Sequence, residues 1–287
     1  MFKKIVLITN SYTKVISDTL NTVISVLENR NIEVSLDKYC GELVAGTSHK
    51  RVNPDTFENG DYDLAIAIGG DGTMLKAAHM VANQDIPLLG INRGRLGFLA
   101  DIPANSVETM LDKILDGEFV EDTRFQLHCQ VDRDNEVMFE SDAFNDVILQ
   151  KGNIGKLIGF ETYVDGIYVH SQRGDGMIVA TPTGSTAYAL SGGGPIIHPS
   201  MDALVLVPIC PHTLSNRPIV IDGNSRVEIV MQESTIESGS LICDGEIICQ
   251  LAEGDRLSVY KKDQRIRLIH PANYDHYSVL RAKLAWG

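Results

Sequence analysis

The chain has 287 residues, of which 44% are hydrophobic and 22% are charged, as is ordinary for a globular protein with two domains or one large domain. Its formal net charge of -13 argues against a nucleic-acid-binding protein, which would carry a basic face. The N-terminal segment MFKKIVLITN has too short an apolar run for a signal peptide or a membrane span, and the five cysteines include no C-x-x-C pair. We therefore expect a cytoplasmic protein with no membrane partner and no disulfide framework.

The first hundred or so residues alternate between short apolar runs, typical of buried strands, and apolar residues at helical spacing. The apolar runs are residues 5–8, 32–36, 64–68 and 87–91, and the helical periods cover 15–27, 74–81 and 107–117. This alternation is typical of a parallel sheet with crossover helices. We predict a doubly wound α/β domain over residues 1–118.

Beyond residue 119 the apolar period changes to two, as in residues 125–131 and 227–231, and helical patterns almost vanish. Asp-Gly dipeptides beside β-branched or aromatic runs predict tight hairpins, and they occur at Asp165-Gly166, Asp222-Gly223 and Asp244-Gly245. We predict an all-β domain over residues 119–270. The last segment, 271–287, is expected to form a short amphipathic helix that packs back on the first domain.

Gly69 to Gly72, with the sequence GGDG, connect the strand at 64–68 to the helix at 74–81. Such a turn bares backbone N–H groups at a helix N-terminus, where the dipole favours an anion and glycine lets a phosphate approach. An ordinary turn in which Asp71 caps the helix is the alternative. A second loop, NRGRLGFL, follows the neighbouring strand, and its Arg93 and Arg95 are either phosphate partners or plain surface residues.

Two segments of the predicted β domain could bind a nucleotide. Residues 173–195, RGDGMIVATPTGSTAYALSGGGP, interleave glycines with hydroxyl groups, which bind ribose and phosphate oxygens. Asn145 and Asp146 precede a strand at 147–149 and could take an amide edge and ribose hydroxyls, or simply form a turn. A serine nucleophile is disfavoured because no G-x-S-x-G elbow is present, and neither the dinucleotide motif G-x-G-x-x-G nor a P-loop occurs.

Four motifs in this order and spacing resemble the NAD kinase family from end to end of the chain: GGDGTML at 69–75, NRGRLGFL at 92–99, Asn145-Asp146, and DGMIVATPTGSTAYALSGGGP at 175–195. GGDG is shared with diacylglycerol, sphingosine and 6-phosphofructo kinases, whereas TPTGSTAY with SGGGP is more specific. The resemblance implies an α/β domain and a β domain with the site between them, assembled as a homodimer or homotetramer. It also implies transfer of the γ-phosphate of ATP to the 2′-hydroxyl of the adenosine ribose of NAD, which gives NADP.

The resemblance further implies that Asp71 is the catalytic aspartate. Positions that would contact the dinucleotide or its pocket are Gly70, Gly72, Asn92, Asn145, Asp146, Lys156, Arg173, Asp175, Thr186, Ala187, Tyr188, Ser191 and Glu246. Asp146 stands where the family usually has Glu, and Glu246 stands where Gln often follows the Asp-Gly pair. No metal ligand is assigned.

A ribose hydroxyl is a poor nucleophile at neutral pH, so a carboxylate such as Asp71 can accept its proton while a divalent ion, Mg²⁺ by preference, neutralises phosphate oxygens. An acidic chain needs that metal and its local arginines to offset the bound phosphates. Two other functions stay open at this point. A lipid kinase that shares GGDGT should offer an apolar acyl channel, and a catalytically silent dinucleotide sensor would have no need of Asp71.

Overall fold

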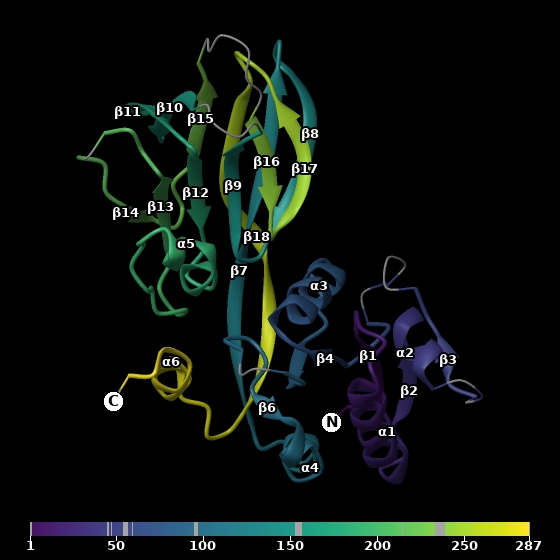
Figure 1. Ribbon diagram of the computed structural model, residues 1–287. Helices are drawn as coiled ribbons and strands as arrows, with labels where there is room; N and C mark the ends of the chain where they lie inside the picture. The colour runs from purple at the N-terminus through teal and green to yellow at the C-terminus, as the bar shows by residue number, and fades with distance from the viewer. Residues whose placement is uncertain are drawn as a thin grey trace. The chain divides into compact units, whose positions relative to one another are not determined.

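Residues 1–123 and 265–287 form one unit of the chain, and residues 124–264 form a second (Figure 1). The computed structural model describes residues 2–44, 46, 48–53, 57–58, 60–94, 97–152, 157–213, 215–232 and 239–286. Two long strands, β7 (Phe119–Arg133) and β18 (Arg256–Pro271), begin in one unit and end in the other. The domain limits expected at residues 118 and 270 stay a prediction, because strands that run through both units leave no single boundary residue.

A largely parallel sheet forms the centre of the first unit, in the order β3-β2-β1-β4-β5-β18. Its shorter strands are β1 (Lys4–Ile8), β2 (Glu33–Leu36), β3 (Lys50–Arg51), β4 (Leu64–Gly69) and β5 (Leu88–Asn92), with β6 (Ile102–Pro103) paired to β5. Strand β1 pairs in parallel with β2 on one side and β4 on the other. The chain therefore reverses its winding direction between β1 and β4, which is where doubly wound sheets bind ligands.

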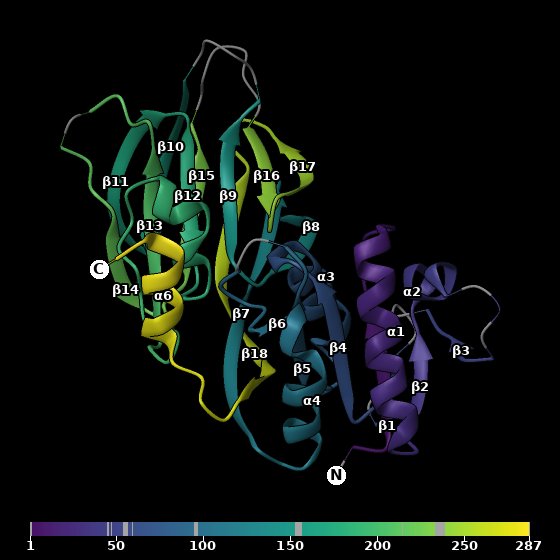
Figure 2. The ribbon, with the colours of Figure 1, turned by 60° about the horizontal axis from the view of Figure 1, so that its bottom comes forward.

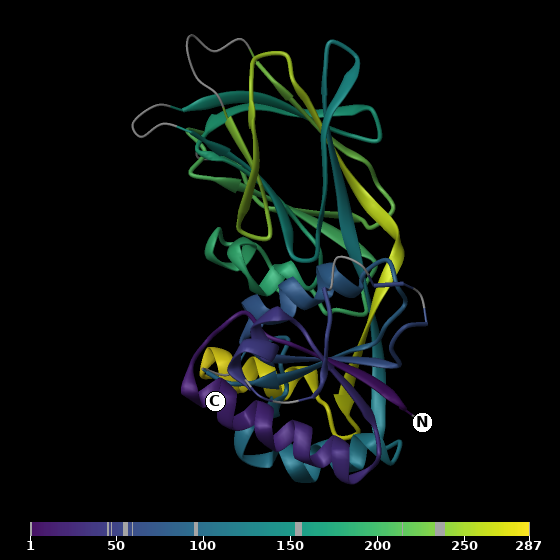
Figure 3. The same cartoon turned by 90° about the vertical axis from the view of Figure 1, so that its right-hand side faces the viewer.

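Helices cover both faces of this sheet. In Figure 3, α1 (Lys14–Asn29) and α4 (Val107–Leu115) lie below the sheet, and α3 (Asp71–Val81) lies above it. The lower helices bury alternate residues of the strands, because side chains of a strand point to opposite faces in turn. Gly117 has a φ of +95° directly after α4, which confirms it as the end of that helix. Two shorter helices, α2 (Lys38–Leu43) and α6 (His276–Leu284), begin at the aspartate caps Asp37 and Asp275.

The second unit is a sandwich of two β layers. One layer is the antiparallel sheet β14-β13-β12-β9-β16-β17, made of β9 (Asp146–Lys151), β12 (Gly176–Ala180), β13 (Ala203–Ile209), β14 (Ile219–Asp222), β16 (Gly239–Cys243) and β17 (Glu246–Leu251). The other combines parts of β7 and β18 with β8 (Glu136–Ala143), β10 (Ile158–Val164), β11 (Ile167–Gly174) and β15 (Val227–Met231).

A buried apolar cluster joins the two layers, with Leu149 and Val179 on one side and Phe160 and Leu257 on the other. On the outer face of the six-stranded sheet, the one-turn helix α5 (Tyr188–Ser191) lies beside β12 (Figure 2). An α/β unit and an all-β unit are the predicted fold class, which is confirmed.

Two of the three predicted hairpins form with the expected left-handed turn residues. Asp165-Gly166 and Asp244-Gly245 have positive φ angles and connect paired strands. The prediction for Asp222-Gly223 is wrong, because β14 pairs with β13 while β15 pairs with β10 and β18. Gly223 is small for another reason: an added Cβ would lie 2.2 Å from the carboxylate of Asp202.

Candidate functional site

The GGDG turn carries the carboxylate of Asp71 at the first position of α3. The N-cap of this helix is Gly70, which has no side chain to bond, so the alternative in which Asp71 is the cap is wrong. The two oxygens of Asp71 instead accept hydrogen bonds from the backbone N–H groups of Phe98, at 2.8 Å, and Leu99, at 3.1 Å. Asp71 thus holds the loop after β5 against the start of α3.

Gly97 allows this loop to approach. A Cβ at that position would lie 1.9 Å from Oδ1 of Asp71, so any larger residue must displace either the loop or the carboxylate. The neighbouring Arg95, a candidate phosphate partner, lies outside the described residues. The second candidate, Arg93, donates from its guanidinium to the carbonyl oxygen of Val15 at 2.9 and 3.1 Å.

Polar side chains tie the ends of β1 and β4 together at the point where the winding reverses. Thr9 donates to the carbonyl oxygen of Ile68 at 2.8 Å, and Thr73 on α3 donates to Asn10 at 2.6 Å. Asn92 ends β5 directly opposite Gly69 and is buried. The structure therefore gathers Gly70, Asp71, Gly72 and Asn92, all predicted site residues, at one edge of the parallel sheet.

In the second unit, Asn145 and Asp146 form a turn that is clamped by Asp244. The carboxylate of Asp244 accepts the backbone N–H groups of Phe144 at 2.7 Å, Asn145 at 2.7 Å and Asp146 at 3.2 Å. Three charge-assisted hydrogen bonds to one carboxylate give the turn a single backbone conformation.

The TPTGSTAY segment packs against the same turn. Thr181 donates from its hydroxyl to the carbonyl oxygen of Phe144 at 2.8 Å and accepts the N–H of Gly184 at 3.0 Å. A Cβ on Gly184 would lie only 2.0 Å from the carbonyl oxygen of Asn145. Glycine is therefore required here by close backbone approach, and the two motifs that sequence analysis treated separately form one structure.

Asp146 is buried in this turn, with 3% of its surface exposed. No described residue donates a hydrogen bond to its carboxylate. Burial, together with the nearby carboxylate of Asp244, raises the pKa of Asp146 to about 7. A carboxylate held in this way gains stability from a ligand that brings hydroxyl donors to it.

The remaining hydroxyl groups of the segment divide into structural and accessible ones. Ser185 is fully buried, donates to Pro182 at 2.6 Å and accepts the N–H of Ile197 at 3.0 Å, which is inconsistent with an attacking serine. By contrast, the positions that were predicted to line the pocket are half-buried or exposed, namely Thr186, Ala187, Tyr188 and Ser191.

Arg173 and Asp175 lie elsewhere on the second unit. They precede β12, whereas Thr181 follows it, so the five residues of that strand separate the two groups by roughly 16 Å at about 3.3 Å per residue. Asp175 forms an ion pair with Lys151 at 2.7 Å. Within one chain, therefore, these residues do not join the Asn145-Asp146 turn.

The last two predicted contacts are Glu246 and Lys156. Glu246 is exposed at the start of β17, on the hairpin that carries Asp244. Lys156 lies outside the described residues.

Sequence analysis did not identify the residues that hold the predicted site residues in place in each unit, above all Asp244, Thr181 and Gly97. Asp244 was recognised as a hairpin residue, but its positive φ of 49° says nothing about where its carboxylate points. Among the described residues, no cluster of three or more His, Cys, Asp or Glu side chains could hold a metal ion by itself. The helices of the described part of the chain include none that is long and apolar enough to cross a membrane.

Family models match both halves of the chain. The model of the ATP-NAD kinase N-terminal domain matches residues 5–119, and that of the ATP-NAD kinase C-terminal domain matches residues 144–271. Curated relatives named NAD kinase include one from Pseudomonas entomophila, 46% identical over 94% of this chain and 91% of its own length. One from Pseudomonas fluorescens is 45% identical over the same shares.

Solved structures share the fold. A yeast NADH kinase complexed with NADH superimposes with a TM-score of 0.90 over 99% of this chain and 88% of its own, at 24% identity. An NAD kinase from Archaeoglobus fulgidus in complex with ATP gives a TM-score of 0.75 over 97% of this chain and 99% of its own, at 21% identity.

Proposed function

This chain belongs to the ATP-NAD kinase family, and we propose how its two half-sites carry out the reaction of that family. The enzyme transfers the γ-phosphate of ATP to the 2′-hydroxyl of the adenosine ribose of NAD, and the product is NADP. The observation that carries the proposed mechanism is the position of Asp71, which follows a buried strand at the winding reversal of the parallel sheet.

In this mechanism Asp71 aligns the 2′-hydroxyl and accepts its proton. Two of the roughly four acceptor positions of a carboxylate are taken by the N–H groups of Phe98 and Leu99, which leaves others for the hydroxyl. Those two bonds fix the orientation of the side chain, and a fixed acceptor lowers the cost of reaching the transition state. The backbone N–H groups at Gly70 to Gly72 face the phosphates.

The dinucleotide is held by the turn of the second unit. Asp146 accepts ribose hydroxyls, and its buried, donor-free carboxylate supports this role. Asn145 takes an amide edge, and the accessible Thr186, Ala187, Tyr188 and Ser191 line the pocket wall. Gly72, Asn92, Lys156 and Glu246 are further proposed contacts. Arg173 and Asp175 are proposed to contact the dinucleotide bound by a second copy of the chain, because within one chain they lie away from the Asn145-Asp146 turn.

We propose that Mg²⁺ accompanies the donor. The absence of a three-residue cluster in the described part of the chain fits this ion, which keeps several waters and takes only one or two carboxylates besides the phosphates. Asp71 is the carboxylate of the GGDG turn that could contribute. When bound, the ion neutralises charge on the phosphate oxygens.

A homodimer or homotetramer in the cytoplasm is also proposed. Ile167 and Ile247 are 71% and 67% exposed on β11 and β17, which are edge strands of the second unit, and exposed apolar edges favour association. The cysteines are all free thiols, which suits a reducing compartment. Light scattering on the eluting protein tests the assembly, and a monomer would contradict it.

The decisive experiment combines the wild-type reaction with Asp71→Asn. Wild-type protein with ATP, Mg²⁺ and NAD should form NADP, detected by a coupled dehydrogenase. In Asp71→Asn the proton acceptor is lost, so kcat should fall by about 10² to 10⁴-fold, while the Kd for NAD measured by calorimetry changes far less.

The structural alternative predicts a different result. If Asp71 only anchors the loop, the Asn variant loses one loop hydrogen bond and about 1 kcal/mol of stability, but it keeps its turnover. Thermal unfolding of the same variant measures that loss. Retention of most of the turnover would remove Asp71 as the base, and NAD binding by a wild type that makes no NADP would support a sensor.

A further inference from the structure

An aromatic pair lies beside the winding reversal of the first unit and has no part in the mechanism above. Tyr12 follows β1 and Tyr39 lies on α2, and their ring centroids are 4.9 Å apart at an interplanar angle of 44°. Tyr12 is 52% exposed. About half of the Tyr12 side chain is therefore accessible to a ligand.

The orientation of Tyr12 is held from its hydroxyl end. Its hydroxyl group is hydrogen-bonded to Glu42, and this bond raises the pKa of Tyr12 to about 12, so the ring stays neutral at physiological pH. A ring held at its edge by a hydrogen bond and on one side by Tyr39 loses little conformational entropy when a planar group stacks on its free face.

A cation accompanies the pair. Nζ of Lys76 on α3 lies 4.6 Å from the centroid of the Tyr39 ring. Lys76 is three residues after Thr73, so it shares the face of α3 whose Thr73 bonds to Asn10, next to the end of β1. The ammonium group is thus on the helix that starts with the GGDG turn, one turn beyond it.

The ring of Tyr12, the ammonium group of Lys76 and the N-terminus of α3, which is proposed to bind phosphate, all lie on the side of the parallel sheet where β1 and β4 end. We propose that the base of the phosphate donor stacks on Tyr12 and that Lys76 binds the phosphates of the same nucleotide. This inference rests on the proposed function, since it concerns the donor of that reaction. Base stacking on an aromatic side chain tolerates any base, so it favours nucleoside triphosphates over inorganic triphosphate without selecting adenine strongly.

Kinetic measurements with ATP and with inorganic tripolyphosphate separate the contribution of the base from that of the phosphates. Tyr12→Ala should raise the KM for ATP about tenfold and leave unchanged both the KM for NAD and the Ki of inorganic tripolyphosphate competing with ATP. Tyr12→Phe keeps the ring but loses the bond to Glu42, so its KM for ATP should rise much less than that of Tyr12→Ala. Lys76→Ala should raise the KM for ATP and the Ki of tripolyphosphate together, because it removes a charge that meets both.

Tyr168→Ala is the matched control. Tyr168 is 53% exposed and packs edge-on against Tyr163 at 5.6 Å, so it reproduces the exposure and the aromatic contact of Tyr12 on the other unit. Its kinetic constants should equal those of wild type. A KM for ATP in Tyr12→Ala within twofold of wild type would overturn the proposal, as would an equal weakening of ATP and tripolyphosphate.

A further measurement needs no variant. Wild-type protein should bind tripolyphosphate at least about fivefold more weakly than ATP in calorimetry without NAD, since the base contributes to binding. Equal affinities would refute stacking even if Tyr12→Ala failed to fold. This titration does not depend on turnover, so it tests stacking even if the wild type forms no NADP. A wild type that forms no NADP would contradict the proposed reaction but not the stacking of the base.

Discussion

Single residues of the second unit have chemical states that their sequence positions do not reveal. Asp146 is the clearest case, because the burial of its carboxylate and the charge of Asp244 raise its pKa to about 7. The carboxylate of Asp244 is itself used by three backbone N–H groups of the turn. The fold thus places two acids together, one satisfied by the backbone and the other available to a ligand.

This pKa gives NAD binding a pH dependence. Ribose hydroxyls donate best to the ionised carboxylate, so the Kd for NAD should fall as the pH rises from 6 to 8 through a pKa of about 7. Asp146→Asn should abolish that dependence. It should also raise the Kd by about tenfold or more, because the variant loses a charge-assisted hydrogen bond to NAD. Calorimetry across this pH range measures both effects.

The control for this prediction is Asp263→Asn, which changes an exposed carboxylate. It should leave the Kd and its pH dependence as they are in the wild type. An NAD affinity of Asp146→Asn that matches the wild type from pH 6 to pH 8 would remove Asp146 from the binding site.

At the scale of elements, glycines decide where segments can meet. Gly97 brings the loop after β5 to Asp71, and Gly184 brings the segment after β12 to the turn before β9. Neither glycine has a left-handed φ angle, so neither is required by its own backbone conformation. Each is required by the backbone or carboxylate opposite it.

Gly184→Ala should therefore separate the two motifs of the second unit. Its Cβ would lie 2.0 Å from the carbonyl oxygen of Asn145, so a backbone shift costing about 1–3 kcal/mol is expected. We expect a lower melting temperature and a raised KM for NAD, measured by calorimetry and by the coupled assay.

Gly159→Ala on β10 is the control for Gly184→Ala, because the nearest atom to its Cβ would be the side-chain oxygen of Gln232 at 3.2 Å. It should shift the melting temperature much less. A Gly184→Ala protein with the melting temperature and KM of wild type would show that the two motifs do not depend on each other.

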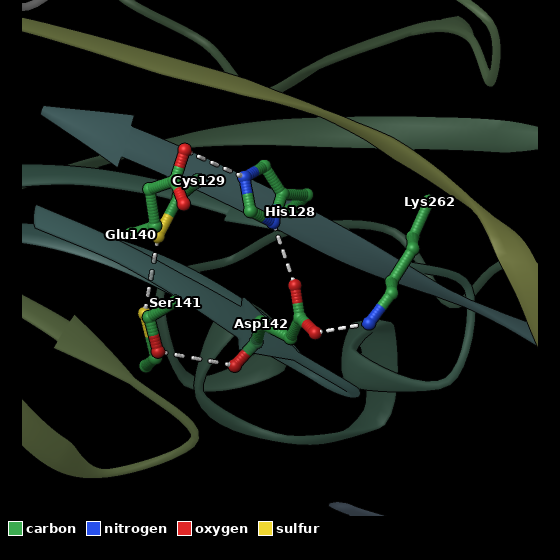
Figure 4. A network of polar contacts seen from close by, with 7 residues as sticks. His128, Cys129, Glu140, Ser141, Asp142 and Lys262 are labelled. Carbon is green, nitrogen blue, oxygen red and sulfur yellow. Dashed lines mark hydrogen bonds and ion pairs between the residues drawn. The ribbon is translucent and has the colours of Figure 1, made fainter. Parts of the chain in front are cut away.

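For the whole molecule, paired carboxylates determine how stability depends on pH. Figure 4 shows the network around Asp142, which bonds to Lys262 and, at 2.7 Å, to Nδ1 of His128. Burial raises the pKa of Asp142, but Lys262 and His128 outweigh it and hold that pKa below its usual value. Asp255, paired with Arg133, and Asp63, bonded to the N–H groups of Lys3 and Lys4, likewise have lowered pKa values.

A carboxyl group with a lowered folded pKa stabilises the fold above its unfolded pKa, near 4, and loses that contribution as the pH falls through the folded pKa. Urea unfolding should thus show that these three carboxyl groups stabilise the fold at neutral pH and that their contribution declines below about pH 4. Asp146 acts in the opposite direction, because its raised pKa lowers stability as the pH rises from about 4 to about 7. Asp142→Asn should lower stability by roughly 2 kcal/mol at pH 7 and make the acid decline shallower, since the charge-assisted hydrogen bonds of Asp142 with Lys262 and His128 are lost.

Asp134→Asn serves as the control in the same titration, because Asp134 is exposed in a turn with a φ of 52° that Asn also tolerates. Its stability curve should follow the wild type. An Asp142→Asn curve parallel to the wild type down to pH 3 would show that the network makes no contribution through ionisation.

The sequence by itself determined the two kinds of fold, the GGDG turn and two hairpins, because these depend on spacing within a few residues. A period of 3.6 or 2 and a glycine or aspartate at a turn act locally. The same local reasoning failed at Asp222-Gly223, where the strand partners are far apart in the chain.

Tertiary structure alone decided what surrounds each acid. Asp71 meets amides 27 and 28 residues away, and Asp244 meets amides 98 to 100 residues away. Tyr12 lies in the segment after β1, whereas Tyr39 lies on α2 and Lys76 on α3. Hydrogen bonds, burial and ring contacts act over a few ångströms in space, so they become visible only when the strands have placed these distant residues side by side.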